Sequence, residues 1–198
     1  NRRPKSMPFF TANNFQPKRK FRFSVHFRDL GEDLVFMAKT AQKPSYNIES
    51  TSHRFLNHEF KFPNIVQWQD VSISFVDAVE PNIGSKFYDT LINMGYLLPS
   101  TIDQYKGAVT KQTSVGAIGG VVIRQLDGGG VVGLQEAGSG ATQLNPNVVD
   151  EWELINAWIT SCKFGEGLDY SSNDLVTVDL TLKYDFAEYR SNVGEIIA

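Results

Sequence analysis

The segment from Asp174 to Phe186 reads DLVTVDLTLKYDF and alternates apolar with polar residues. This period of two predicts a β-strand with one buried and one polar face. The segment is longer than the usual strand of about five or six residues. A long strand at a sheet edge also exposes backbone groups that can pair with another chain. The polar face therefore meets either bulk water or an aqueous space that several chains enclose.

Further alternating segments predict more strands. Residues 20–40 contain KFRFSVHF and LVFMAKT around a turn and predict one hairpin. Residues 121–137 contain VVIRQL and VVGLQEA around DGGG and predict a second hairpin. The segment WQDVSISFVDA at 68–78 predicts a single strand. The segment WELINAWITSCKF at 152–164 predicts a long strand that pairs with the opening segment through the turn GEGLDYSSND.

One segment, SKFYDTLINMGY, has the period of a helix. Ser85 is a suitable N-cap, an apolar stripe begins at Phe87, and Gly95 can end the helix in the left-handed conformation. The segment GAVTKQTSVGAIGG at 107–120 has the composition of a loop. The sequence therefore predicts a mainly β fold, an antiparallel β-sandwich or barrel with one short α-helix packed against it.

The charges of the chain are unevenly distributed, although the net charge is only −3. Eight of the 19 basic residues, and none of the 22 acidic residues, precede Asp29. Residues 1–17 lack periodicity and predict an extended basic arm, ahead of a β domain at 18–190 and a C-terminal tail at 191–198. Such an arm can bind nucleic acid or an acidic partner, including another copy of this chain. The candidate docking residues of the arm are Arg2, Arg3 and Lys5.

No motif of an enzyme or of a cofactor site stands out. The glycine-rich stretch lacks the phosphate-binding G-x-x-x-x-G-K-[ST] pattern. His53 and His58 are five residues apart in a strand or loop, which predicts opposite faces and no metal site. Cys162 fits a packed strand residue, and Asp169 and Asp174 fit a turn. We therefore expect no catalysis, no metal and no cofactor. No apolar run approaches the roughly 20 residues of a membrane-spanning helix, so no membrane contact is expected.

Several short sequence segments follow one another along the chain in an order that is informative as a set. They are NFQPKRKFRFSVHF, MAKTAQKPSYNIE, FPNIVQWQDVSISFVD, SKFYDTLINMG, VVIRQL and the segment from Trp152 to Phe186. This ordered set resembles the tail tube protein of contractile phages, whose fold is similar to that of the tubes of contractile injection systems and of type VI secretion. The resemblance spans residues 15–186 and implies a tail tube fold for the β domain.

The resemblance also implies a homohexameric ring, in which each subunit contributes part of an inner β-sheet, and a tube of stacked rings inside a tail sheath. Such a tube belongs to a virion tail assembled in the host cytoplasm on a baseplate or tube initiator. Its lumen conducts DNA during ejection without specific binding. In this family a long hairpin or loop reaches the adjacent ring, and it maps to residues 43–60. The candidate inter-ring contacts are Lys43, Pro44, Tyr46, Asn47, Glu49, Arg54, Phe55 and His58.

On this hypothesis the polar face of the long strand lines the lumen, with the candidate residues Thr177, Asp179, Thr181 and Asp185. Small polar and acidic side chains suit a DNA conduit, because a basic wall would hold phosphates through many ion pairs. The alternative is that this face meets bulk solvent outside. The arm, the glycine-rich segment 107–146 and the tail depart from the short family members. They leave open a tube initiator or terminator ring, or a β-barrel module that binds nucleic acid.

Overall fold

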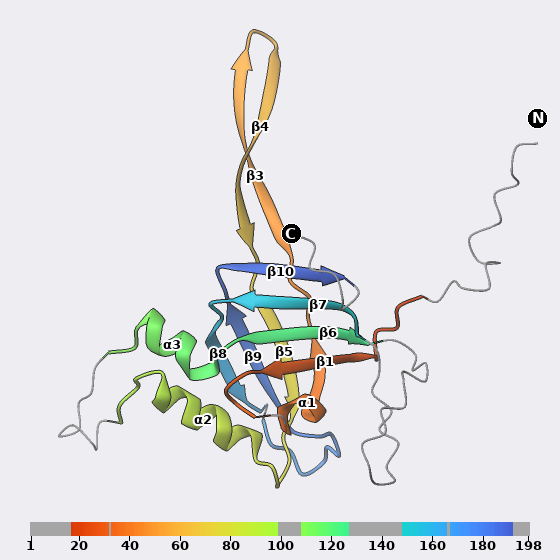
Figure 1. Ribbon diagram of the computed structural model, residues 1–198, viewed down its shortest axis with the longest axis vertical. Helices are drawn as coiled ribbons and strands as arrows, with labels where there is room; N and C mark the ends of the chain where they lie inside the picture. Colours follow the sequence, from red (N-terminus) through yellow and green to blue (C-terminus); the bar gives the residue numbers. More distant parts are fainter. Residues whose placement is uncertain (1–16, 32, 99–107, 127–147, 166, 192–198) are drawn as a thin grey trace, which may run out of the picture.

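The computed structural model describes residues 17–31, 33–98, 108–126, 148–165 and 167–191 (Figure 1). Within these residues the chain forms two four-stranded antiparallel sheets, one long two-stranded hairpin and three helices. The predicted fold class, mainly β and antiparallel with a packed helix, is confirmed. The number of helices is larger than expected.

The two sheets are named here for their edge strands. The β1–β10 sheet consists of β1 (Phe23–Phe27), β6 (Val121–Leu126), β7 (Val148–Ile155) and β10 (Phe186–Ser191), in that order. The β2–β8 sheet consists of β2 (Ala38–Ala41), β5 (Val71–Val76), β9 (Thr177–Lys183) and β8 (Trp158–Phe164), in that order. Within the described residues each edge strand has a strand neighbour on one side only.

The inward faces of both sheets make one hydrophobic core, because alternate residues of each strand point to the same side. The ring of Phe75 on β5 lies 5.9 Å from the ring of Phe27 on β1. It also lies 5.5 Å from the ring of Phe87 on helix α2 (Ile83–Asn93). These three rings join both sheets to the helix. The surrounding buried residues include Val25, Val71, Ile73, Val121, Ile123, Leu154, Val178, Leu180 and Leu182.

Helix α2 confirms the predicted helix but has a different N-cap. Asn82 precedes the first turn, and its side-chain oxygen accepts a hydrogen bond from the backbone N–H of Ser85 at 2.7 Å. The carboxylate of Asp77 accepts a further hydrogen bond from the backbone N–H of Ile83 at 3.2 Å. Gly95 follows the helix with φ +106, a conformation that glycine adopts without a Cβ clash. The predicted cap at Ser85 is therefore wrong by three residues.

Two shorter helices occupy segments for which a strand and a loop were predicted. Helix α1 (Asp33–Met37) replaces the start of the returning strand, and its Leu34 is fully buried. A short apolar run fits either a strand or a buried helix by period alone. Helix α3 (Lys111–Ile118) lies in the predicted loop, beside α2 (Figure 1), and begins with a reciprocal cap between Thr110 and Thr113. The usual capping box carries Glu or Gln at the second position, so its signal was absent here.

The two short hairpins predicted from neighbouring segments are wrong. β1 pairs with β6 and β2 pairs with β5, so the chain passes from one sheet to the other between β1 and β2. β6 lies between β1 and β7, so strands of the β1–β10 sheet occupy both of its edges. VVGLQEA is therefore not the partner of VVIRQL. Its residues 131–137 lie outside the described residues, as does most of the glycine-rich segment.

The predicted long strand at 152–164 is two strands in different sheets. Asn156 has a left-handed backbone conformation with φ 54, and the following Ala157 is fully buried, so the chain turns a corner between β7 and β8. A second corner ends β9 at Lys183 and starts β10 at Phe186. The opening segment is therefore not one strand through Phe186. Its predicted antiparallel pairing with β8 is confirmed.

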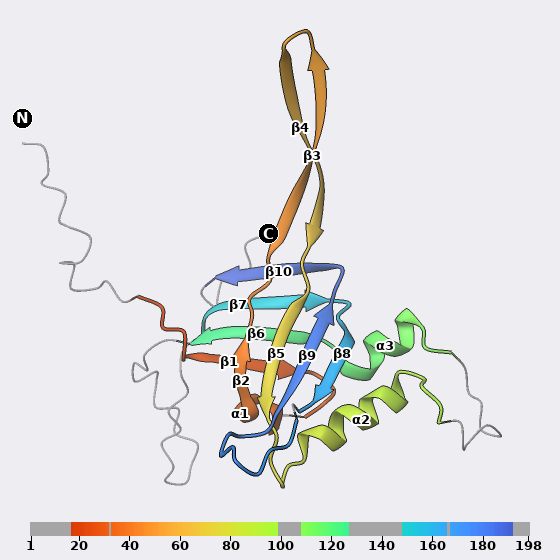
Figure 2. The same cartoon turned by 180° about the vertical axis from the view of Figure 1, so that it is seen from behind.

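A long hairpin of β3 (Tyr46–Phe55) and β4 (His58–Trp68) projects from the body of the molecule (Figure 1). Figure 2 shows the same projection from behind, continuing the direction of β2 and β5. All ten residues of β3 are exposed. The projecting hairpin predicted for residues 43–60 is confirmed, and its second strand runs further than expected.

Candidate assembly surfaces

The outward face of the β2–β8 sheet carries short hydroxylated side chains and is named here the hydroxyl face. The register places Ser74 and Lys163 on either side of Asp179. The hydroxyl residues of this face are Thr40, Ser72, Ser74, Ser161, Thr177 and Thr181. Three of the four predicted lumen residues therefore share one face. The face has no acidic excess, because Lys163 lies across from Asp179.

The fourth predicted lumen residue, Asp185, lies in the corner between β9 and β10. Its carboxylate accepts hydrogen bonds from Lys111 Nζ at 2.6 and 2.7 Å and from Asn156 Nδ2 at 2.8 Å. The hydrogen bonds from Lys111, and then that from Asn156, hold the pKa of Asp185 below its usual value. Asp185 therefore connects the corner to helix α3 and is not part of strand β9.

Cys162 lies on β8, and its side chain is half-buried against the core. Burial, with a smaller contribution from the negative charge of Asp179, raises the pKa of the Cys162 thiol to about 11. The thiol is therefore protonated near neutral pH, whereas a nucleophilic cysteine needs a thiolate. This environment agrees with the predicted packing role of Cys162.

The outward face of the β1–β10 sheet carries a network of ion pairs. Glu151 pairs with Arg124 Nε at 2.6 Å and with Arg190 Nη1 at 3.3 Å. Glu153 pairs with Arg190 Nη2 at 2.9 Å and also with Arg28. The two glutamate side chains are only 9% and 8% exposed, and buried carboxylates need such partners. The charges of this face are thus largely neutralised within the chain.

Part of the basic N-terminal region contacts the chain's own acidic strand. Lys18 Nζ forms an ion pair with Asp150 on β7, and Lys43 Nζ lies 3.4 Å from the same carboxylate. The hydrogen bond to Asp150 raises the pKa of Lys18. The predicted docking residues Arg2, Arg3 and Lys5 lie outside the described residues.

The base of the hairpin is attached to the body by a row of aromatic rings. The ring of Tyr46 lies 5.6 Å from that of Trp68, which lies 6.0 Å from the ring of Tyr184. The Tyr184 hydroxyl donates a hydrogen bond to the carbonyl of Gln69 at 2.9 Å. Of the predicted inter-ring contacts, Lys43, Pro44 and Tyr46 therefore lie at this base.

The outer half of the hairpin has one largely aromatic face. The register pairs Phe55 with His58 and His53 with Phe60, so these four side chains point to the same side. The prediction that His53 and His58 lie on opposite faces is wrong, because the turn lies between them. Among the residues that the structure describes, no group of three or more side chains could hold a metal ion. Asn47, Glu49 and Arg54 also lie on the hairpin, all exposed.

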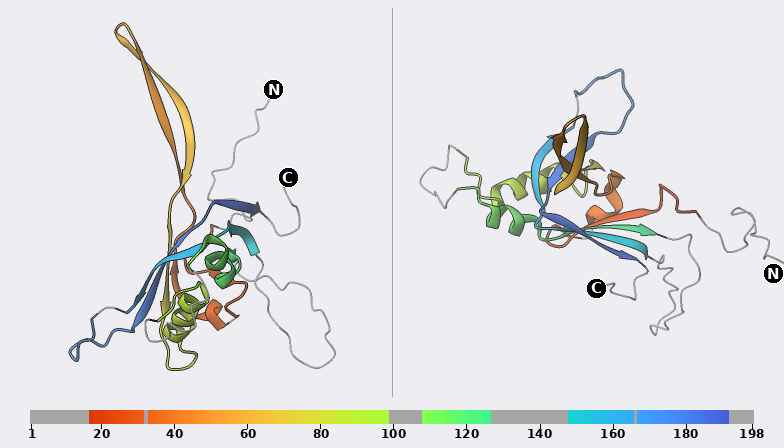
Figure 3. Two further views of the ribbon diagram at one scale, coloured as in Figure 1. Left: turned by 90° about the vertical axis from the view of Figure 1, so that its left-hand side faces the viewer. Right: turned by 90° about the horizontal axis from the view of Figure 1, so that it is seen from above.

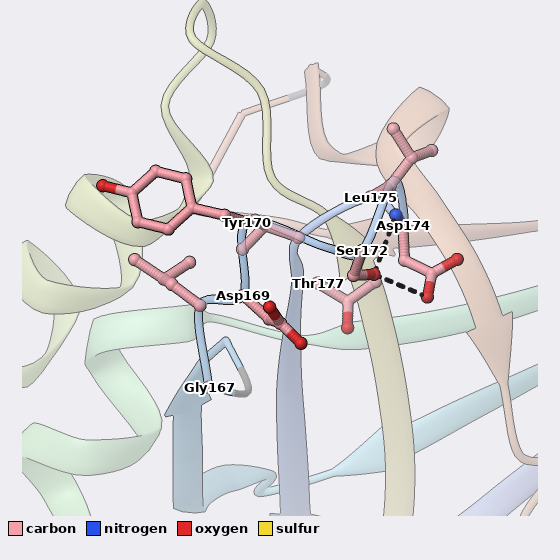
Figure 4. A pocket seen from close by; sticks show the side chains of 9 residues that line it. Gly167, Asp169, Tyr170, Ser172, Asp174, Leu175 and Thr177 are labelled. Atoms are coloured by element: carbon pink, nitrogen blue, oxygen red, sulfur yellow. Dashed lines mark hydrogen bonds between the residues drawn. The ribbon is translucent and has the colours of Figure 1, made fainter.

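A shallow pocket is formed by the loop that connects β8 to β9, residues 167–176, together with Thr177 (Figure 4). The hydroxyl of Ser172 donates to Asp174 Oδ2 at 3.0 Å, and Asp169 Oδ1 accepts from the backbone N–H of Ser171 at 2.9 Å. The hydrogen bonds from Ser171 hold the pKa of Asp169 below its usual value. The two carboxylates thus stabilise a turn, as predicted. In Figure 4 the Tyr170 ring points away from them.

Sequence reasoning missed the ion-pair network and the aromatic face of the hairpin. The acidic residues of VVDEWELI were a sequence signal for the ion-pair network. Their arginine partners, however, lie on two other strands and just after a third. Phe60 and Phe62 signalled the second, because they alternate with charged residues beyond the His58 turn. None of the helices that the structure describes is long and apolar enough to cross a membrane.

Comparison with solved structures gives the chain the fold of tube proteins of contractile injection systems. The tube-terminating cap of the anti-feeding prophage has a TM-score of 0.56 at 18% identity, over 89% of this chain and 93% of that chain. The PVC sheath/tube terminator, from an extracellular contractile injection system in its extended state, has a TM-score of 0.54 at 16% identity, over 90% and 99%.

A chain of the PVC sheath–tube complex in its extended state has a TM-score of 0.53 at 16% identity, over 88% of this chain and 92% of that chain. No protein-family model matches the sequence, and no curated protein matches it. The tail tube fold expected from the ordered sequence phrases is thus confirmed by structural similarity.

Proposed function

We propose that the chain is a structural ring subunit of a contractile tail or injection tube. The proposal rests mainly on the β2–β8 sheet, which has a hydroxyl face and whose two edge strands each have one side without a strand neighbour among the described residues. Pairing β8 of one copy with β2 of the next would close this sheet into a barrel and satisfy both edges. Six copies related by rotation would give the hexameric ring that the sequence resemblance implies.

The hydroxyl face then lines the lumen, with Thr177, Asp179 and Thr181 in each subunit. Asp179 compensates Lys163, and Lys183 at the end of β9 leaves one positive charge among the short hydroxyl groups of each subunit. Phosphates bind proteins chiefly through uncompensated lysine and arginine. A wall with so few uncompensated cations supports passage of DNA with little retention. The Asp185 carboxylate accepts hydrogen bonds from Lys111 and lies in the corner between β9 and β10, so we assign it a structural role.

The remaining surfaces of the subunit contact the partners of the ring. The projecting hairpin contacts an adjacent ring through Glu49, Arg54, Phe55 and His58, and the arm with Arg2, Arg3 and Lys5 docks on an acidic neighbour. The outer surface meets a tail sheath, and the end of the tube meets a baseplate or initiator. The chain has a non-enzymatic role within a virion tail or a related particle that is assembled in the host cytoplasm.

A terminator ring is the second candidate, favoured by the similarity to the anti-feeding prophage cap and the PVC terminator. Electron microscopy and sedimentation of the purified chain over a range of concentrations separate the possibilities. A repeated subunit forms long tubes alone, whereas a terminator forms single rings that cap tubes of its partner. A chain that stays monomeric and binds DNA in a salt-sensitive manner is a nucleic-acid-binding module, and this result would overturn the proposal.

A further inference from the structure

The molecule carries exposed apolar residues at the two ends of its longest axis. One group lies at the hairpin tip, residues 53–62, and the other lies in the β8–β9 loop, residues 167–176. Figure 3 shows the tip and this loop at opposite ends, and Figures 1 and 2 agree. The exposed apolar residues of the tip are Phe55, Leu56, Phe60 and Phe62, and those of the loop are Leu168, Tyr170, Leu175 and Val176.

The hairpin turn holds Leu56 in a backbone conformation that leucine rarely adopts. It has φ 53, a left-handed conformation in which a branched side chain is strained and in which glycine or asparagine is usual. Its side chain is also 79% exposed, so it makes little packing contact within the chain. A leucine at this position therefore serves a contact outside the molecule better than it serves the hairpin.

The two ends also have complementary charges. The tip carries Arg54 and Lys61 against a single Glu59. The loop carries Asp169 and Asp174 and no lysine or arginine. Hydrogen bonds from Ser171 and Ser172 hold these two carboxylates in fixed positions, so their charge is presented without reordering.

We propose that the hairpin tip of one copy docks on the β8–β9 loop of a second copy in the next layer. This inference rests on the proposed function and names the partner surface of the hairpin. Contact between opposite ends is heterologous, and such contacts repeat indefinitely when the copies are related by translation along one axis. Within the tip Glu59 lies across from Arg54, so Lys61 leaves a net positive charge, and a tip-to-tip contact would bring two such charges together. Contact between the tip of one copy and the loop of the next is therefore more favourable than contact between two tips.

Site-directed cross-linking tests this contact directly. Leu56→Cys and Tyr170→Cys are made in two separately tagged chains, which are mixed, assembled and oxidised. Cys162 is half-buried and is retained in every variant as a common background. We expect the mixed Leu56–Tyr170 disulfide to exceed both self-linked products severalfold. Val109→Cys, an exposed position beside α3, replaces Tyr170→Cys in the matched control and should give no excess.

A second variant separates assembly from folding. Leu56→Gly relieves the left-handed backbone, so the melting temperature of the unassembled chain should stay the same or rise. The same variant removes the apolar contact, so stacked rings should become markedly shorter at equal protein concentration. If Leu56 were needed only for the fold, Leu56→Gly would instead lower the melting temperature of the unassembled chain.

The outcomes distinguish this inference from the proposed function. Tubes without the mixed cross-link, with self-linked tips, or with tips linked to a sheath protein overturn the docking contact alone. Unchanged tube length for Leu56→Gly also overturns it. The absence of any ring or tube in electron micrographs overturns both the docking contact and the proposed function.

Discussion

The hydroxyl of Ser74 on β5 donates a hydrogen bond to the carboxylate of Asp179 on β9, across the outward face of the β2–β8 sheet. Lys163 lies opposite Asp179 on the other neighbouring strand. Asp179 is therefore positioned by groups of its own chain before any partner arrives. Its charge is a fixed property of the hydroxyl face.

Asp179→Lys should leave ring formation intact and slow the passage of DNA. The residue points outward, and a lysine stem can extend its charge into water. The change removes the carboxylate that compensates Lys163 and adds a positive charge in every subunit, so phosphates should be retained more strongly at low salt than at high salt. The measurement is the rate of DNA release from particles at two salt concentrations. Asp179→Asn is the size-matched control, and equal release rates for Asp179→Lys and the parent would contradict the lumen placement.

Asp185→Asn should change the acid stability of the fold. The folded-state pKa of Asp185 is held down by Lys111 and Asn156, so the ionised carboxylate stabilises the fold above its unfolded pKa of about 3.9. This stabilisation is lost as the pH falls through the lower folded pKa. The ion pair is exposed to solvent, so the variant should lose only about 0.5 kcal/mol at pH 7. Melting temperatures of parent and variant should differ at neutral pH and converge in strong acid, whereas a constant difference would contradict the pairing.

Phe75→Ala should destabilise the isolated chain by roughly 3–5 kcal/mol, the usual cost of removing a buried aromatic ring. Phe75 is fully buried and its ring contacts Phe27 and Phe87, so its truncation removes the ring contacts that join the two sheets to α2 and leaves a cavity. Urea denaturation of unassembled protein measures the loss. Phe55→Ala, at a position that is 62% exposed, is the control and should leave the unfolding free energy nearly unchanged.

Deleting residues 1–17 should weaken ring stacking without changing the stability of the β domain. The deletion removes Arg2, Arg3 and Lys5 and retains Lys18 with its ion pair to Asp150. The basic arm is expected to dock on an acidic neighbour, so its loss costs contacts between copies. Tube length in negative-stain micrographs is the measurement. Tubes as long as those of the parent would reject the docking role of the arm.

The elements that could be predicted from the sequence are those whose local pattern agrees with their final burial. In β9, residues 177–183 alternate as they do in the sheet, and Phe87 starts a stripe that packs on the core as a helix stripe should. A long hairpin or loop at residues 43–60 was expected from the resemblance to tail tube proteins, and the arms of the hairpin of β3 and β4 are joined locally. Their pairing needs no information from distant residues.

The missed features depend on contacts between distant segments. Alternation identified β1 as a strand, but its partner β6 lies about a hundred residues away, and no local signal selects it. The corner at Asn156 was missed because apolar residues continue on both sides of it, although the buried positions shift there from Leu154 to Ala157, three residues on. Glu151 and Glu153 could be recognised as acids in a strand, whereas their arginine partners come from other strands and were not predictable.

The ten exposed residues of β3 have a consequence for the cell that makes this protein. In a freshly synthesised copy this strand is not covered by any other part of the chain that the structure describes. Copies made in the absence of their partners should therefore associate with one another, and the fraction of monomer should fall as the concentration of this polypeptide rises.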